Sequence, residues 1–219
     1  MNASRKLDNR LALCARFVRH GARLADIGTD HAYLPVWLCQ NGVCPGAVAA
    51  DINPEPLSRG QQTVEEAGMW DKISLRLSNG LSQIKPDEAD DIVIAGMGGE
   101  LIAKIIDDCA FARDGQKHFI LQPMTKSEEL LRFLCAEGFT VLEQDCCVAA
   151  KKCYTVLLVR YTGLTQVTDE LFYYTGRLDP SQPLHRRFLS EHAARLRKKA
   201  RSDERWGQLA ERIEILMEN

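Results

Sequence analysis

Short apolar segments alternate with helix-like segments between residues 22 and 161, and this alternation restricts the possible folds more than any other feature. Strands are predicted by RLADIG, GAVAADI, KISLRLSNG, DDIVIAGMGG and HFILQPM, with helix-like segments between all but the third and fourth. Strands joined through helices lie parallel in one sheet that carries helices on both faces. FTVLEQDCC and KCYTVLLVRY follow each other too closely for a helix, so they pair antiparallel. We therefore predict an α/β fold with a doubly wound, mostly parallel sheet that ends in an antiparallel pair.

The two ends of the chain show helical periodicity instead. Apolar residues at helical spacing predict an amphipathic helix over residues 5–20. The same period over residues 184–219 predicts two helices, broken near Ser202, that fold back on each other as a hairpin. We expect residues 1–161 to form one domain that includes the N-terminal helix, and residues 162–219 to form a small helical, coiled-coil-like domain.

Composition restricts the class of protein only broadly. The net charge of the 219 residues is −2, so the total charge does not demand a nucleic-acid partner. Basic residues nevertheless cluster near both ends, which marks either a partner surface or two solvated helix faces. The eight cysteines form no C-x-x-C pair and lie mostly in apolar segments, so we expect reduced, structural thiols and no metal site. With no signal peptide and no membrane-length apolar segment, a cytosolic protein is expected.

The segment DIGTDH follows the first predicted strand and precedes a helix. A helix start after Gly28 offers unpaired N–H groups, but the second and third glycines of a dinucleotide fingerprint are missing, and Asp30 would repel pyrophosphate. S-adenosyl-L-methionine suits this loop better, because Asp26 or Asp30 can hold its ammonium group and its sulfonium tolerates nearby carboxylates. The alternative is an ordinary aspartate that caps a helix.

Polar groups also end the second and third strands. Asp51, followed by Ile52, ends the second strand and suits the ribose hydroxyls of a nucleoside. Asn79 and Gly80 close the third strand, where an amide can meet the adenine edge. Each group alone is also consistent with a simple turn. Three strand ends that suit one nucleoside together predict a cofactor site.

The fourth and fifth strands end in segments suited to a second ligand. Gly96, Gly98 and Gly99, with Met97 among them, leave the backbone bare beside the expected methyl group, which makes room for a flat acceptor base. The alternative is a loose turn before a helix. Gln122, before Pro123, ends the fifth strand, and its amide is expected to read the edge of that base.

These segments together resemble one enzyme family. DIGTDHAYLP, AADI with P-x-P-L, SNGL, IAGMGGELI and ILQP occur in the order and spacing of the bacterial tRNA adenine-N1 methyltransferases called TrmK, over about residues 5–160. The resemblance implies a class I Rossmann-like methyltransferase domain that uses S-adenosyl-L-methionine to methylate adenine 22 of tRNA, and a helical, coiled-coil C-terminal domain. Asn79 stands where many relatives are expected to have Asp, but Asn can still donate to adenine N1.

The resemblance also implies roles for the residues of these segments. Cofactor contacts are implied for Asp26, Gly28, Asp30, Asp51, Ile52, Asn79, Gly80 and Gly96, and an active-site position for Asp30, His31, Gly96, Met97, Gly98, Gly99, Gln122 and Pro123. Adenine N1 attacks the methyl group without losing a proton first, so the enzyme has to align the reactants and stabilise the developing positive charge. Asp30 is expected to do this or to hold the cofactor. His31 supports that geometry, contacts the nucleotide, or is only a structural hydrogen-bonder.

The basic segments would then bind RNA phosphates, which position the RNA without reading its sequence. These residues are Arg5, Arg16, Arg19, Arg23, Arg186, Arg187, Arg195, Arg197, Lys198, Lys199 and Arg201. N1 lies on the pairing edge, so the target adenine has to be exposed before it reacts. The expected assembly is a monomer or weak dimer, away from membranes. The alternatives are a class I methyltransferase acting on another RNA, a protein or a small molecule, a non-catalytic RNA-binding module, and, with the glycines against it, an NAD-dependent oxidoreductase.

Overall fold

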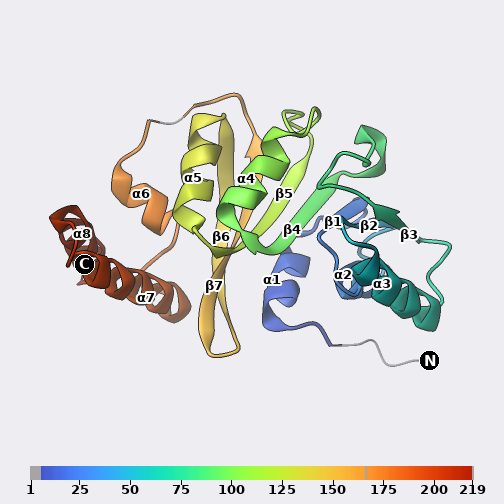
Figure 1. The fold of residues 1–219 in the computed structure, drawn as a ribbon, viewed down its shortest axis with the longest axis horizontal. Helices are drawn as coiled ribbons and strands as arrows, with labels where there is room; N and C mark the ends of the chain where they lie inside the picture. The colour runs from blue at the N-terminus through green and yellow to red at the C-terminus, as the bar shows by residue number, and fades with distance from the viewer. Residues whose placement is uncertain (1–5, 166, 219) are drawn as a thin grey trace.

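The computed structural model describes residues 6–165 and 167–218, and a seven-stranded sheet runs through its centre (Figure 1). The strand order is β3-β2-β1-β4-β5-β7-β6. The first five strands pair in parallel, whereas β7 lies antiparallel between β5 and β6. The predicted fold class is therefore confirmed. The strands are β1 Leu24–Ile27, β2 Ala47–Asp51, β3 Ile73–Leu77, β4 Asp91–Gly98, β5 His118–Thr125, β6 Phe139–Ala149 and β7 Lys152–Tyr161.

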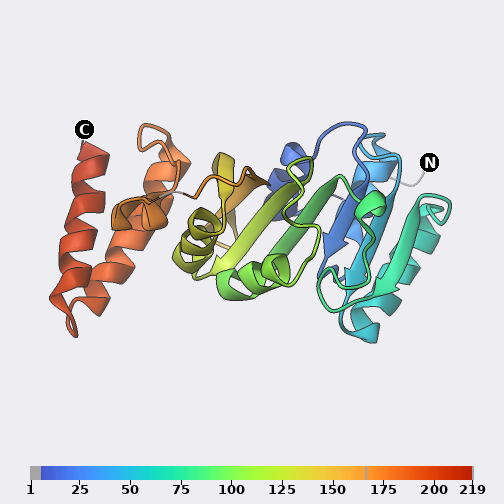
Figure 2. The same ribbon diagram turned by 90° about the horizontal axis from the view of Figure 1, so that it is seen from above.

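Helices cover both faces of this sheet (Figure 2). Side chains alternate along β4, so that Ile92 and Ile94 pack on the core under α4 and α5, and Val93 packs on the core under α1, α2 and α3. This alternation is the period of two expected for a strand buried on both faces. The helices are α1 Asn9–Phe17, α2 Tyr33–Gln40, α3 Pro54–Ala67, α4 Gly99–Asp107, α5 Ser127–Ala136, α6 Glu170–Thr175, α7 Pro183–Lys199 and α8 Glu204–Glu218.

Helix α1 is shorter than the helix predicted over residues 5–20. It begins at Asn9 because the Asp8 carboxylate caps it, accepting hydrogen bonds from the backbone N–H groups of Arg10 and Leu11. It ends at Phe17. Residues 1–5, and Arg5 with them, lie outside the described residues.

The C-terminal helices pack on the β6 edge of the sheet. Helix α7 ends at Lys199 and α8 begins at Glu204, and the two helices run side by side, as the sequence predicts (Figure 2). The short helix α6 was not predicted. Together these helices form a third apolar cluster, which also buries Cys146 of β6 and Cys153 of β7.

The cysteines lie where small apolar side chains are expected. All eight are buried free thiols. Within residues 6–165 and 167–218, no cluster of His, Cys, Asp or Glu is arranged to hold a metal ion. No helix in the same part of the chain has both the length and the apolar character needed to cross a membrane.

Candidate active site

The loop after β1 lies at the edge of the sheet where the parallel strands end. The N–H groups of Gly28 and Thr29 both donate to the carbonyl of Ala50 in β2. Gly28 has a φ of +79°, and a Cβ atom there would lie 2.0 Å from Cε of Met97. Only glycine fits this close approach to the end of β4 without a shift of the methionine. The loop and the GMGG segment therefore form one continuous surface.

A cleft of about 380 Å³ opens beside this surface, a volume within the usual range for small-molecule sites. Its walls come from the start of α1, the loop after β1, the start of α2 and the turn of β4. Expected site residues therefore share this cleft with residues that were not predicted. The lining residues are Asp8, Arg10, Leu11, Asp26, Gly28, Thr29, Asp30, His31, Ala32, Tyr33, Leu34, Ala95 and Gly96.

Asp26 is the buried acid of the cleft. Desolvation raises the pKa of its carboxyl group to about 6, a hydrogen bond with Thr29 opposes this rise, and the charge of Asp51 adds to it. A buried carboxylate of this kind is stabilised by a cationic ligand group, because the cation replaces the lost hydration. Perturbed acids in clefts are typical of functional sites.

Arg10, which sequence reasoning missed, joins α1 to the ends of β4 and β5. Its guanidinium pairs with Asp8 at 2.7 Å and donates to Oε1 of Gln122 at 3.4 Å. The same Gln122 oxygen accepts from the N–H of Gly96 at 3.1 Å, and the Gln122 amide nitrogen donates to the carbonyl of Pro123. Gln122 is fully buried, so its amide holds the Gly96 turn rather than facing a ligand as expected.

Asp30 and His31 lie at the rim of the cleft. The Asp30 side chain is 63% exposed and pairs with Arg59 of α3 at 2.5 Å, and its other oxygen lies 3.5 Å from Nε2 of His31. The His31 ring stacks on Tyr33, with ring centroids 4.8 Å apart. The hydrogen bond with Asp30 raises the pKa of Arg59, as expected for a cation beside a carboxylate. The rim is thus an exposed network in which Asp30 keeps access to solvent.

The ends of β2 and β3 form the neighbouring part of the site. One carboxylate oxygen of Asp51 accepts from the N–H of Asn53, and Ile52 is 57% exposed. The carbonyl of Asp51 accepts from the N–H of Ser78, which brings Asn79 and Gly80 to the same sheet edge. The residues at the ends of β2 and β3 do not line the cleft of Asp26, but the negative charge of Asp51 helps to raise the pKa of Asp26.

The expected RNA contacts near the N-terminus have structural partners. The guanidinium of Arg19 binds the fully buried carboxylate of Asp91, and Arg23 binds Asp90 through two nitrogens. Asp90 and Asp91 lie at the start of β4, so both pairs lie at the opposite end of the sheet from the cleft. Arg16 pairs with Asp145 of β6.

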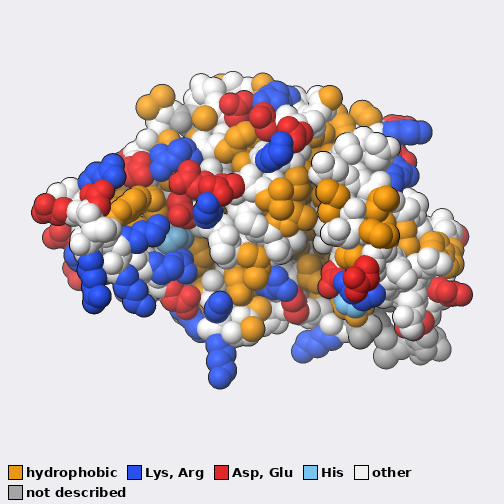
Figure 3. All heavy atoms as spheres, viewed as in Figure 1, with side chains coloured by type: hydrophobic (Ala, Val, Ile, Leu, Met, Phe, Trp, Pro, Cys, Tyr) orange, Lys and Arg blue, Asp and Glu red, His pale blue; other side chains and the backbone are white. Residues whose placement is uncertain are grey.

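The expected RNA contacts near the C-terminus divide into two groups. Arg187 pairs with Glu191 and Arg197 with Glu214, and Arg186 donates to the carbonyl of Pro180. The second group is Arg195, Lys198, Lys199 and Arg201, and no carboxylate of the described residues lies within ion-pair distance of these side chains. Figure 3 shows Lys and Arg side chains gathered over α7 and α8.

Comparison with known proteins gives a consistent result. The family model described as "Methyltransferase domain" matches residues 7–157. The tRNA (adenine(22)-N(1))-methyltransferase of Bacillus subtilis is 36% identical over 173 residues, which cover 79% of this chain and 73% of the relative.

Solved structures share the fold over nearly the whole chain. The crystal structure of the B. subtilis m1A22 tRNA methyltransferase TrmK superimposes with a TM-score of 0.81 at 28% identity, covering 97% of this chain and 96% of the other. A Streptococcus pneumoniae protein in complex with S-adenosyl-L-methionine gives a TM-score of 0.88 at 29% identity, covering 97% and 100%. The chain therefore belongs to the methyltransferase family that includes the B. subtilis tRNA (adenine(22)-N(1))-methyltransferase.

Proposed function

We propose that this protein transfers a methyl group from S-adenosyl-L-methionine to N1 of adenine 22 in tRNA. The observation that carries the proposal is the buried carboxylate of Asp26, which lines the same cleft as the open backbone of Gly96. An acid with a pKa raised by burial suits the cofactor's ammonium group, and bare backbone suits a flat base. Membership of the family supports the same activity.

The residues around the cleft fit the cofactor. Gly96 has a φ of +80°, and a Cβ atom there would meet no other atom within 4 Å, so the turn borders open space. Asp51 has a carboxylate oxygen left over for ribose hydroxyls after its bond to Asn53. Ile52 offers an exposed apolar surface for the adenine ring, with Asn79 and Gly80 at its edge. Gly28 lines the cleft beside Asp26.

The cofactor, when bound, supplies a methyl group on a positively charged sulfur. Asp26 neutralises the ammonium group and fixes one end of the donor. Gln122 and Arg10 hold the Gly96 turn, so the space for the target base is formed in advance. Asp30 stabilises the positive charge that develops on the base as its lone pair attacks the methyl group. No general base is required, since N1 carries no proton.

We extend the proposal to the organisation of the chain. Residues 1–161, with Met97, Gly98 and Pro123 around the target base, would carry out the methyl transfer. Residues 162–219 would form the helical domain that binds RNA, mainly through the basic residues of α7 that have no carboxylate partner. A cytoplasmic location fits a tRNA-modifying enzyme.

Methylation of a defined transcript tests the proposal. The protein is incubated with labelled S-adenosyl-L-methionine and an unmodified tRNA transcript, and the modified nucleoside is mapped. We expect N1-methyladenosine at position 22, and no product from a transcript with guanine at that position. Label at another position, or in protein or small molecules only, would contradict the proposed substrate. Cofactor binding with no transfer to any substrate would indicate a binding module.

A further inference from the structure

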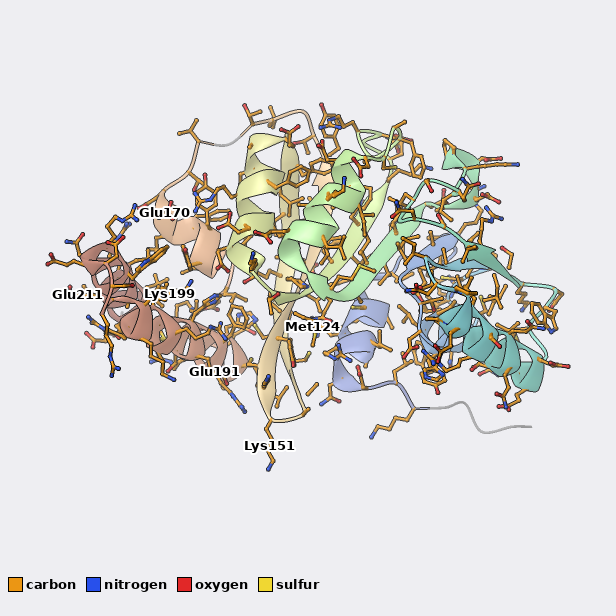
Figure 4. The ribbon with its side chains drawn as sticks, in the orientation of Figure 1. Met124, Lys151, Glu170, Glu191, Lys199 and Glu211 are labelled. Carbon is orange, nitrogen blue, oxygen red and sulfur yellow. The ribbon has the colours of Figure 1, made fainter. Side chains whose placement is uncertain are left out.

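A second cleft, of about 260 Å³, lies where the C-terminal helices meet the sheet. Its walls come from the end of β5, the start of α5, β7 and one side of α7. Met124 and Lys199, both labelled in Figure 4, belong to opposite walls: Met124 lies near the end of β5 and Lys199 is the last residue of α7. Pro123, which was expected in the active site, lines this second cleft as well.

The second cleft shares a wall with the active-site cleft. Arg10, which lines the first cleft, donates to Sδ of Met124 at 3.3 Å, and its guanidinium lies 5.8 Å from the ring centroid of Tyr154. Met124 and Tyr154 both line the second cleft. A ligand there would be separated from a base in the active site by little more than these side chains.

The rim of the second cleft is basic on the side of α7. Arg195 and Lys199 both line it. Arg195 is exposed and has no carboxylate partner among the described residues, and Lys199 lies with Nζ 5.0 Å from the ring centroid of Trp206. Cations without an acidic partner attract anions from solution. This rim is suited to a phosphate group.

The floor of the second cleft contains a polar pair that is not fully bonded. His192 is nine-tenths buried, and its Nδ1 has no hydrogen-bond partner among the described residues. Its Nε2 lies 3.9 Å from a carboxylate oxygen of Glu128, which is longer than a hydrogen bond. A buried polar atom without a partner is costly, and such atoms often await a ligand or water. The floor can therefore accept a ligand with hydrogen-bonding edges.

We propose that this second cleft holds one unpaired nucleotide of the RNA substrate, next to the nucleotide that is methylated. Its base lies against Met124 and Tyr154, with its polar edge toward Glu128 and His192, and its phosphate lies on the rim formed by Arg195 and Lys199. Aromatic and apolar side chains that stack a base, combined with cations for the backbone, are the usual means of holding single-stranded RNA. The proposal rests on the proposed RNA substrate.

Two double variants separate this site from a general basic surface. Arg195→Gln with Lys199→Gln removes two charges that line the cleft, whereas Lys198→Gln with Arg201→Gln removes two charges nearby that do not. Binding of the unmodified tRNA transcript is measured for both over a range of salt concentrations, together with binding of S-adenosyl-L-methionine. The cleft pair should weaken tRNA binding about tenfold or more, with a loss of about 1.4 from the slope of log affinity against log salt.

The control pair should weaken tRNA binding several-fold less than the cleft pair, because both charges that line the cleft remain. Cofactor affinity should stay at the wild-type value in both. Equal effects of the two pairs would overturn the proposal in favour of a diffuse basic surface. No effect of the cleft pair on tRNA would also overturn it and would point to a protein partner for this groove. Because binding is measured directly, unequal effects without methylation at adenine 22 would contradict the proposed function but not the second site.

The base-reading part of the proposal is tested with Glu128→Gln. Transcripts carrying each of the four bases on either side of adenine 22 are compared by kcat/KM. The wild-type protein should prefer at one of these positions a base with an amino group, which donates to the carboxylate. The Glu128→Gln variant should show a weaker preference, because an amide oxygen accepts a hydrogen bond less strongly than a carboxylate, while its thermal stability and cofactor affinity remain unchanged. If the wild-type protein gave equal kcat/KM for all four bases at both positions, the proposal that the cleft binds a base would be refuted.

Discussion

Replacing Asp26 by Asn should make the protein more stable and its cofactor site weaker. Burial raises the pKa of Asp26 from 3.8 to about 6, so the folded protein binds more protons than the unfolded chain between these pH values. The free energy of unfolding therefore falls as the pH rises through this window. A shift of about two pKa units corresponds to a cost of about 3 kcal/mol for the ionised carboxylate above pH 6. Asn has the shape of the protonated acid, can still bond to Thr29, and does not ionise.

The measurement is urea unfolding of both proteins from pH 4 to pH 8, with calorimetry of S-adenosyl-L-methionine binding at pH 8. We expect Asp26→Asn to gain about 3 kcal/mol at pH 8 and almost nothing at pH 4. Cofactor affinity should fall about tenfold or more, because the ammonium group loses a charged partner. Asp30→Asn is the control for stability, since that side chain is 63% exposed and its surface ion pair contributes little to the free energy of unfolding. Equal stability of Asp26→Asn and wild type at pH 8, or unchanged cofactor affinity, would refute the reasoning.

Three further substitutions test separate parts of the site. Asp51→Ala should weaken cofactor binding by about 1.5–3 kcal/mol, as the ribose loses a charged acceptor, and unchanged affinity by calorimetry would remove Asp51 from the site. Gly99→Ala should lower stability in thermal unfolding by about 1–3 kcal/mol, because its Cβ would lie 2.1 Å from the carbonyl oxygen of Lys126, whereas Gly207→Ala, in a helix with its nearest contact at 3.5 Å, should be neutral or stabilising. Asp30→Asn should lower kcat by about 10²–10³ in single turnovers at saturating cofactor, and a wild-type rate would leave Asp30 only its structural ion pair.

The sequence predicts the strands and most of the helices because their signals are local. Apolar segments bounded by glycines and polar turns identify all seven strands, and helical spacing identifies α7 and α8. Helix α6 has six residues, too few for a periodic signal. The ends of α1 were wrong because the Asp8 cap, rather than the apolar period, fixes where the helix begins.

The parts of the site that depend on distant contacts could not be predicted. Arg10 and Gln122 are 112 residues apart, and only the folded chain shows that they share a hydrogen bond. Arg19 and Arg23 looked like free cations in the sequence, whereas the fold pairs them with acids at the start of β4. Charge counted along a chain does not show which charges are already paired.

The antiparallel direction of β7 determines how the active-site cleft and the proposed RNA-binding residues of α7 are spaced. The chain leaves the sheet at Tyr161, at the end opposite the active site, and yet α7 returns to the active-site end (Figure 1). Its position there depends on side-chain contacts such as the hydrogen bond of His185 with Asp145 at 2.8 Å. In the proposed reaction, the angle between α7 and the sheet sets the distance between the RNA backbone bound by α7 and the adenine that is methylated. Substitutions at the contacts that hold α7 on the sheet would therefore change which adenine along the tRNA reaches the methyl donor. The basic residues of α7 and the residues of the active-site cleft would stay unchanged.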